Sequence, residues 1–145
     1  MTSRSYLKCG NRLIYRAAEI IALTTIALPL APRALADDAR ARASLRRLDL
    51  EMRLEQVCDL EAMERIGRET SLYRPDRAKS DVISHPQHLG DILSASGAAF
   101  RSRGRWYALS FVCKASADHL KVLTFDYRIG DAIPEAEWAG YGLWR

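Results

Sequence analysis

The sequence lacks most of the patterns that identify an enzyme. Its 145 residues include three cysteines and three histidines, and they contain neither a Gly-x-Ser-x-Gly nor the combined set of Ser-x-x-Lys, Ser-Asp-Asn and Lys-Thr-Gly for a serine nucleophile. No Gly-rich phosphate loop is present, and no two histidines lie four residues apart around a glutamate, as in zinc proteases. The sequence therefore offers no catalytic residue by motif, and we expect no cofactor.

A long hydrophobic run is also missing. A membrane span needs about 20 apolar residues, whereas the apolar run at 20–28 follows Glu19 and ends at Pro29. Four basic residues and no acid precede Glu19, and Ala34-Leu35-Ala36 forms a small-x-small site directly before Asp37. This order is typical of a secretory signal peptide.

We therefore predict a cleaved signal over 1–36, with cleavage between Ala36 and Asp37, and a single mature domain over 37–145 in the periplasm or secreted. An uncleaved anchor and a buried core helix are the less favoured alternatives. After cleavage no stable membrane span is expected.

The predicted mature domain has no charge excess of either sign. The whole chain has 22 basic and 18 acidic residues, and removing the five basic and one acidic residues of 1–36 leaves 17 of each. A nucleic-acid partner requires a net or clustered positive field. We therefore expect no nucleic-acid partner, and an unknown envelope component or protein instead.

Two cysteines remain after cleavage, Cys58 and Cys113. An even number in an exported chain indicates a disulfide, and two thiols alone make a poor zinc site, which usually takes four ligands with short Cys-x-x-Cys spacings. We predict a Cys58–Cys113 bridge and no metal, with free thiols and a metal site as the weaker alternatives.

The fold class predicted is α+β, with N-terminal helices packed on a C-terminal antiparallel meander of about three strands. Residues 37–70 are rich in good helix formers, and either Asp59 begins a second helix or a single helix bends near Cys58. Residues 71–91 hold two prolines and several turn formers, so we expect a loop with at most a short strand at 81–84.

Alternating side chains predict strands within 92–130, and a tail rich in aromatic residues follows at 131–145. Leu109, Phe111 and Cys113 share the heavier face of one strand, so Cys113 is expected to face the core and the helices. The disulfide would then join the sheet to a helix.

The histidines are weak candidates for chemistry. His85 and His88 lie in the predicted loop between Asp81 and Asp91, where they could serve a hydrolase or a metal-dependent enzyme. Two exposed loop histidines are the favoured interpretation. His119 follows a turn residue and is expected to be solvated.

Aromatic residues give the only binding signal. Trp106 lies on the lighter sheet face, and Trp138, Tyr141 and Trp144 lie in the tail, where exposed rings could stack on sugars or peptides. The favoured alternative is that the tail folds back over the sheet. A nearby turn holds three arginines that could bind a carboxylate or phosphate, although a polar hairpin tip explains them more simply: Arg101, Arg103 and Arg105.

Three segments together resemble one known family: LEQVCDLEAMERI, GAAFRSRGRWYALSFVC and FDYRIGDAIPEAEW. They resemble the bacterial family catalogued as domain of unknown function 930, which consists of small exported proteins, mostly alphaproteobacterial. The resemblance covers residues 48–143, and Cys58 and Cys113 match its two cysteines. It implies export and a disulfide, and it carries over no catalytic residue.

The sequence favours a non-enzymatic exported module that binds a partner or an envelope component. One alternative is a structural or inhibitor-like protein that acts through the sheet edge or the tail. The least favoured is an enzyme that uses His85 and His88.

Overall fold

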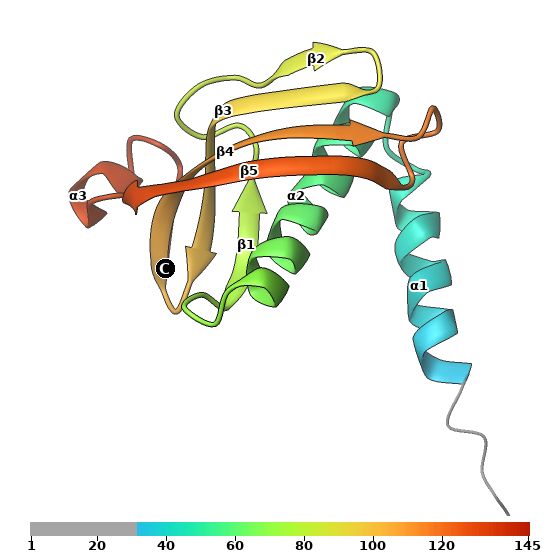
Figure 1. Ribbon diagram of the computed structural model, residues 1–145, viewed down its shortest axis with the longest axis horizontal. Helices are drawn as coiled ribbons and strands as arrows, with labels where there is room; N and C mark the ends of the chain where they lie inside the picture. The colour runs from blue at the N-terminus through green and yellow to red at the C-terminus, as the bar shows by residue number, and fades with distance from the viewer. Residues whose placement is uncertain (1–31) are drawn as a thin grey trace, which may run out of the picture. The chain divides into compact units, whose positions relative to one another are not determined.

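The computed structural model describes the backbone of residues 32–145 and the side chains of residues 38–145 (Figure 1). The predicted signal segment falls mostly outside the described residues, so its removal stays a prediction. Its proposed cleavage site, Ala36 and Asp37, lies within the first helix, α1 (Pro32–Leu45). None of the helices in the described range is long and apolar enough to cross a membrane.

The second helix, α2, runs unbroken from Leu50 to Glu69. Its N-cap is Asp49, whose side chain accepts a hydrogen bond from the backbone N–H of Met52 at 2.9 Å, a standard way of satisfying a free helix N–H. The predicted cap or bend at 58–59 is therefore wrong. Asp59 lies in mid-helix, and the corner between the helices lies at 46–49.

One arginine holds that corner. The guanidinium of Arg53 donates hydrogen bonds to the carbonyl oxygens of Leu45, Arg46 and Leu48 at 2.8–3.2 Å, and to that of Asp118 at 3.0 Å. Leu45 ends α1, and Arg46 and Leu48 lie in the corner that follows it, so the Arg53 side chain satisfies carbonyls outside the regular hydrogen bonding of the helix.

The sheet is antiparallel, with strand order β1-β3-β4-β5, and β2 pairs with β3. The strands and a final short helix have these bounds: β1 Pro75–Lys79, β2 Gln87–Leu89, β3 Ile92–Ser102, β4 Arg105–Ala115, β5 Val122–Ala132 and α3 Glu135–Trp138. The predicted α+β class and the meander, here β3-β4-β5, are confirmed.

The strand count exceeds the prediction because β1 and β2 lie within the segment 71–91 that was expected to be a loop. The expected strand at 81–84 is not one. Neither β1, with the sequence PDRAK, nor the three-residue β2 has an alternating apolar pattern. Both strands form because they pair with β3, and a local sequence pattern does not indicate such a distant partner.

Figure 1 shows α2 lying against one face of the sheet. The helix buries an apolar stripe, and the core between them contains these residues: Leu54, Val57, Cys58, Ala62 and Ile66 of α2 with Leu93, Phe100, Leu109, Phe111, Cys113 and Phe125 of the sheet. Cys58 and Cys113 are fully buried and form a disulfide, as predicted. The bridge joins α2 to β4.

A second, smaller core lies on the other sheet face at the end near α3. Here the C-terminal tail packs on Trp106, and the buried members of this core are Ala99, Trp106, Ile133, Trp138 and Leu143. The indole N–H of Trp106 donates to the carbonyl oxygen of Trp144 at 2.8 Å, and that of Trp138 donates to Ile133 at 2.9 Å. The alternative in which the tail folds back over the sheet therefore holds.

Candidate functional site

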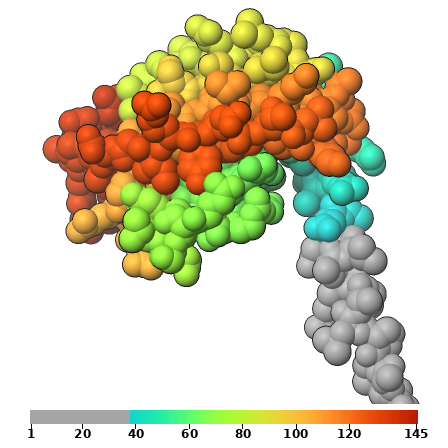
Figure 2. Space-filling view, viewed as in Figure 1, coloured from blue at the N-terminus to red at the C-terminus, as the bar shows by residue number. Residues whose placement is uncertain are grey.

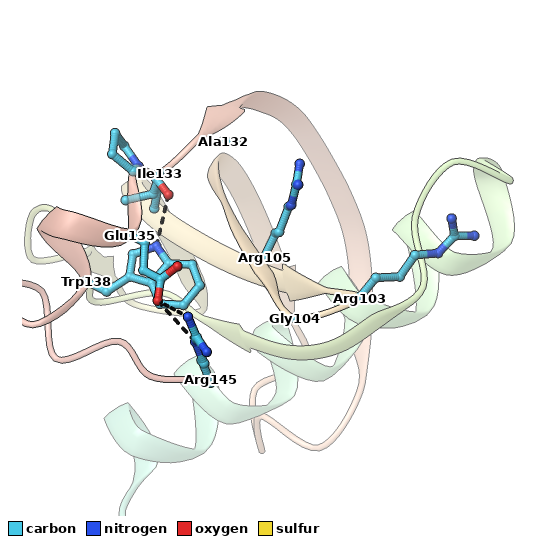
Figure 3. A pocket seen from close by; sticks show the side chains of 9 residues that line it. Arg103, Gly104, Arg105, Ala132, Ile133, Glu135, Trp138 and Arg145 are labelled. Atoms are coloured by element: carbon cyan, nitrogen blue, oxygen red, sulfur yellow. Dashed lines mark hydrogen bonds and ion pairs between the residues drawn. The ribbon is translucent and has the colours of Figure 1, made fainter.

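One pocket lies at the end of the sheet, between the β3–β4 hairpin and α3 (Figure 3). It has a volume of about 530 Å³. The residues that line it come from the hairpin turn, the end of β5, α3 and the C-terminus: Arg103, Gly104, Arg105, Ala132, Ile133, Pro134, Glu135, Trp138 and Arg145. We call it the hairpin-end pocket.

A two-residue turn places the arginines at this pocket. Ser102 pairs with Arg105, and the residues between them, Arg103 and Gly104, have φ angles of 51° and 76°. Positive φ at both turn positions is the pattern of a type I′ hairpin, which matches the twist of the strands. Arg103 and Arg105 therefore stand at the tip and the base of a tight turn.

The charges of the pocket are only partly neutralised. Arg145 is paired with Glu135, with a distance of 3.1 Å between its Nε and the carboxylate oxygen. Arg103 and Arg105 are exposed, and within the described residues neither forms an ion pair or a side-chain hydrogen bond. Figure 3 shows Glu135, Trp138 and Arg145 clustered together and Arg105 standing apart from them. A small anion could bind the free guanidinium groups.

Arg101, the third arginine of the predicted set, does not belong to this pocket. Its guanidinium binds both carboxylate oxygens of Asp76 at 2.9 and 3.2 Å, lies over the ring of Trp106 and donates to the carbonyl of Trp144. Arg101 therefore serves the packing of the tail.

The four predicted ligand-binding aromatic residues do not form one surface. Trp106 is fully buried and Trp138 is 8% exposed, because the tail and the sheet close over both rings, so neither can present a free face for stacking. Tyr141 is half-buried beside the same core. Trp144 is 47% exposed, but Arg77 and Lys79 lie over its ring, 5.1 and 5.7 Å from the centroid. Of the four, only Trp138 lines the hairpin-end pocket.

The structure separates the histidines. His85 pairs with Asp81 at 3.0 Å, whereas His88 pairs with Glu55 of α2 at 2.9 Å. Within residues 38–145, no three histidine, cysteine or acidic side chains are placed to hold a metal ion. Within these residues, His85 and His88 therefore do not form the ligand set that the alternative of a metal site requires.

His119 is buried rather than solvated. Its Nδ1 lies 2.8 Å from the carbonyl oxygen of Leu50, and its Nε2 lies 3.0 Å from the carboxylate of Asp91. The turn between β4 and β5 folds the ring onto the start of α2, which a turn pattern alone does not indicate. Asp91 is therefore paired with His119 rather than with His85 or His88.

Sequence reasoning considered Asp59 only as a helix cap and missed its buried carboxyl. It lies in a groove of about 430 Å³ between α2 and β1, and its Oδ1 is buried without a hydrogen-bond partner. Burial raises the pKa of Asp59 to about 7; hydrogen bonds from Ser80 and the charge of Lys79 lower it, and the charge of Glu55 raises it. The stripe Asp59, Ala62 and Ile66 follows the 3,4 spacing of a buried helix face, and that signal could have identified this carboxyl.

The family model described as Domain of Unknown Function (DUF930) matches residues 45–143. The chain belongs to this family. The DUF930 match contains α2, all five strands and most of the hairpin-end pocket. Neither a curated protein nor a solved structure gives a significant match. The DUF930 assignment thus covers the described core, and any functional conclusion depends on the geometry above.

Proposed function

We propose that this DUF930 protein is an exported, non-enzymatic module that binds a carboxylate- or phosphate-bearing component of the cell envelope in the hairpin-end pocket. The observation that carries this proposal is Arg105, whose guanidinium forms no ion pair within the described residues and lies beside a pocket of about 530 Å³. Arg103 lies at the tip of the same turn, and its side chain extends away from that of Arg105 (Figure 3). A single guanidinium group presents parallel N–H donors in one plane, which suits two-point binding of a carboxylate or a phosphate.

The chemistry of the pocket favours binding over catalysis. Its charged side chains are three arginines and Glu135, and Glu135 is paired with Arg145. A hydrolase needs a nucleophile within hydrogen-bond reach of a base, and no serine, cysteine or histidine lines this pocket. The buried disulfide occupies both cysteines of the described chain.

Export has two independent supports. The first is the basic, apolar and small-x-small order of the N-terminal segment. The second is the Cys58–Cys113 disulfide, because such bridges persist mainly in oxidising compartments. Together they favour the periplasm or the exterior.

The structural or inhibitor-like alternative loses support because its main element, the aromatic tail, is packed into the second core. Removing the tail would expose Trp106 rather than delete a free binding segment.

The test is a titration of the ¹⁵N-labelled, oxidised protein with citrate and with inorganic phosphate, followed by amide chemical shifts. Sodium chloride at matched ionic strength is the reference for screening. We expect saturable shifts at Gly104, Arg105 and the indole of Trp138, and their loss in the double variant R103Q/R105Q.

The matched control is Arg47→Gln, which removes an exposed arginine from the corner between the helices. This variant should titrate like the wild type. The proposal is wrong if neither anion gives a saturable shift, or if the double variant responds as the wild type does.

A further inference from the structure

β5 forms one edge of the sheet. It pairs with β4 on one side, and no other strand in the described chain pairs with its outer side. Figure 2 shows β5 uncovered along its length in that view. An 11-residue edge with unpaired backbone groups can pair with another strand unless the protein protects it.

The edge is regular only in its middle. The register of β4 and β5 shifts between Tyr107 and Leu109 and again between Lys114 and Ala115. Such irregularities twist a strand away from a flat template and limit further pairing. The regular part of β5 is the segment 124–129, and a partner strand would pair there.

Two opposite charges lie on the outer face of this segment. Asp126 and Arg128 are both exposed, and their partners on β4 are the uncharged Val112 and Ser110. Within the described residues neither charge forms an ion pair or a hydrogen bond. They lie two residues apart, so they share one face of the strand.

We propose that a second copy of this chain pairs with β5 in antiparallel fashion, with the two-fold axis at Tyr127. In this register Asp126 lies opposite Arg128 of the second copy, and Arg128 lies opposite Asp126 of the second copy. Residues directly opposite in such a pair have Cβ atoms about 5 Å apart, so both charge pairs form at once. A two-fold interface uses the same patch on both copies, which this strand supplies.

The inner face of β5 suits the same register. Phe125 and Ile129 both pack on the main core, and the two-fold axis at Tyr127 puts Phe125 opposite Ile129 of the second copy. An aromatic ring opposite a β-branched side chain is a favourable cross-strand pair. The apolar layer between sheet and helix would then continue from one copy into the next.

Neighbouring registers are less favourable, and this is what selects a single one. Moving the axis by one residue, to Asp126 or Arg128, sets identical charges opposite each other, which is destabilising. Moving it by two residues, to Phe125 or Ile129, sets both charges opposite uncharged residues. Only the axis at Tyr127 pairs both charges.

The experiment measures the molar mass of the oxidised protein by light scattering, over a dilution series and at low and high salt. We expect a dimer that weakens with salt. Asp126→Arg and Arg128→Asp each set like charges opposite each other and should give monomer. The double swap D126R/R128D restores opposite charges in the same register and should restore the dimer.

Lys114→Asp is the matched control, because it reverses an exposed charge on β4, one strand away from the edge. This variant should leave the dimer unchanged. A wild type that stays monomeric at its highest soluble concentration overturns the proposal, as does a dimer that survives both single variants or is not restored by the double swap.

A cross-link tests the register itself. A mixture of D126C and R128C chains should form an intermolecular disulfide on mild oxidation, since directly opposite Cα atoms lie within the span of such a bond. Each variant alone should cross-link more slowly, because its own cysteines are only diagonal neighbours. Equal rates in all three samples would contradict the axis at Tyr127, and would fit an edge that accepts other extended peptides instead.

Discussion

The disulfide between Cys58 and Cys113 joins the middle of α2 to β4 inside the main core, with both residues fully buried. Its two ends are 55 residues apart in the sequence, so it closes a loop that contains β1, β2 and β3. In the chain-entropy model a loop of this length contributes about 4 kcal/mol. That is a large share of the stability of a small domain.

The double variant C58A/C113A should therefore unfold at a lower urea concentration, with a loss of about 4 kcal/mol in the free energy of unfolding. Urea denaturation of the variant, of the oxidised wild type and of the reduced wild type measures this loss. Reduced wild type should behave like the variant. Equal midpoints for all three samples would contradict a stabilising bridge.

Asp59 should make stability depend on pH. Folding raises its pKa from 3.8 to about 7 because the carboxyl is buried, so between these values the folded state keeps a proton that the unfolded chain has lost. The free energy of unfolding must then fall as pH rises from about 4 to about 7, by at most about 4 kcal/mol. Above pH 7 the folded state holds a buried, charged carboxylate, and the loss of stability is complete.

Asp59→Asn removes this titration while keeping the shape of the side chain. We expect the variant to be more stable than the wild type at pH 8, and the difference to shrink toward pH 4. Urea unfolding at several pH values measures both effects. The control Asp131→Asn, at an exposed site on β5, should follow the wild type, and a parallel curve for Asp59→Asn would rule out this role for the carboxyl.

The features that sequence patterns predicted are those with a strong local signal. Alternation over β4 places Cys113 in the core, and the helix composition before residue 70 gives α2. Features that depend on distant partners were missed. β1 forms because it pairs with β3. His119 is buried because its ring contacts the carbonyl oxygen of Leu50 and the carboxylate of Asp91.

The hairpin-end pocket lies between these two cases. The turn with its three arginines was visible in the sequence, but nothing local tells Arg101 from the other two. Arg101 is engaged because Asp76 of β1 lies beside it, at a position that only the β1–β3 pairing produces. The same holds for Trp106, whose burial depends on a C-terminal segment 27 or more residues away.

The C-terminal tail should behave as core. Leu143 is buried against Trp106 in the second core, so Leu143→Ala should cost about 2–3 kcal/mol and shift tryptophan fluorescence to longer wavelength. Leu89→Ala makes the same change at an exposed position on β2 and should cost less than about 0.5 kcal/mol. Equal urea midpoints for the two variants would mean that the tail is not part of the folded core.

Export can be decided by the intact mass of the protein, taken from an envelope extract without reductant and after thiol alkylation. The N-terminal pattern predicts a chain that begins at Asp37, and the disulfide predicts a mass two hydrogens below the reduced form with no alkyl group attached. Cys9 leaves with the predicted signal, so it adds no alkyl group either.

A mass that retains the N-terminal segment and carries alkylated Cys58 and Cys113 would contradict both export and the bridge. The four net positive charges of 1–36 would then stay on the chain, and an anionic membrane surface would become the partner that the charges favour.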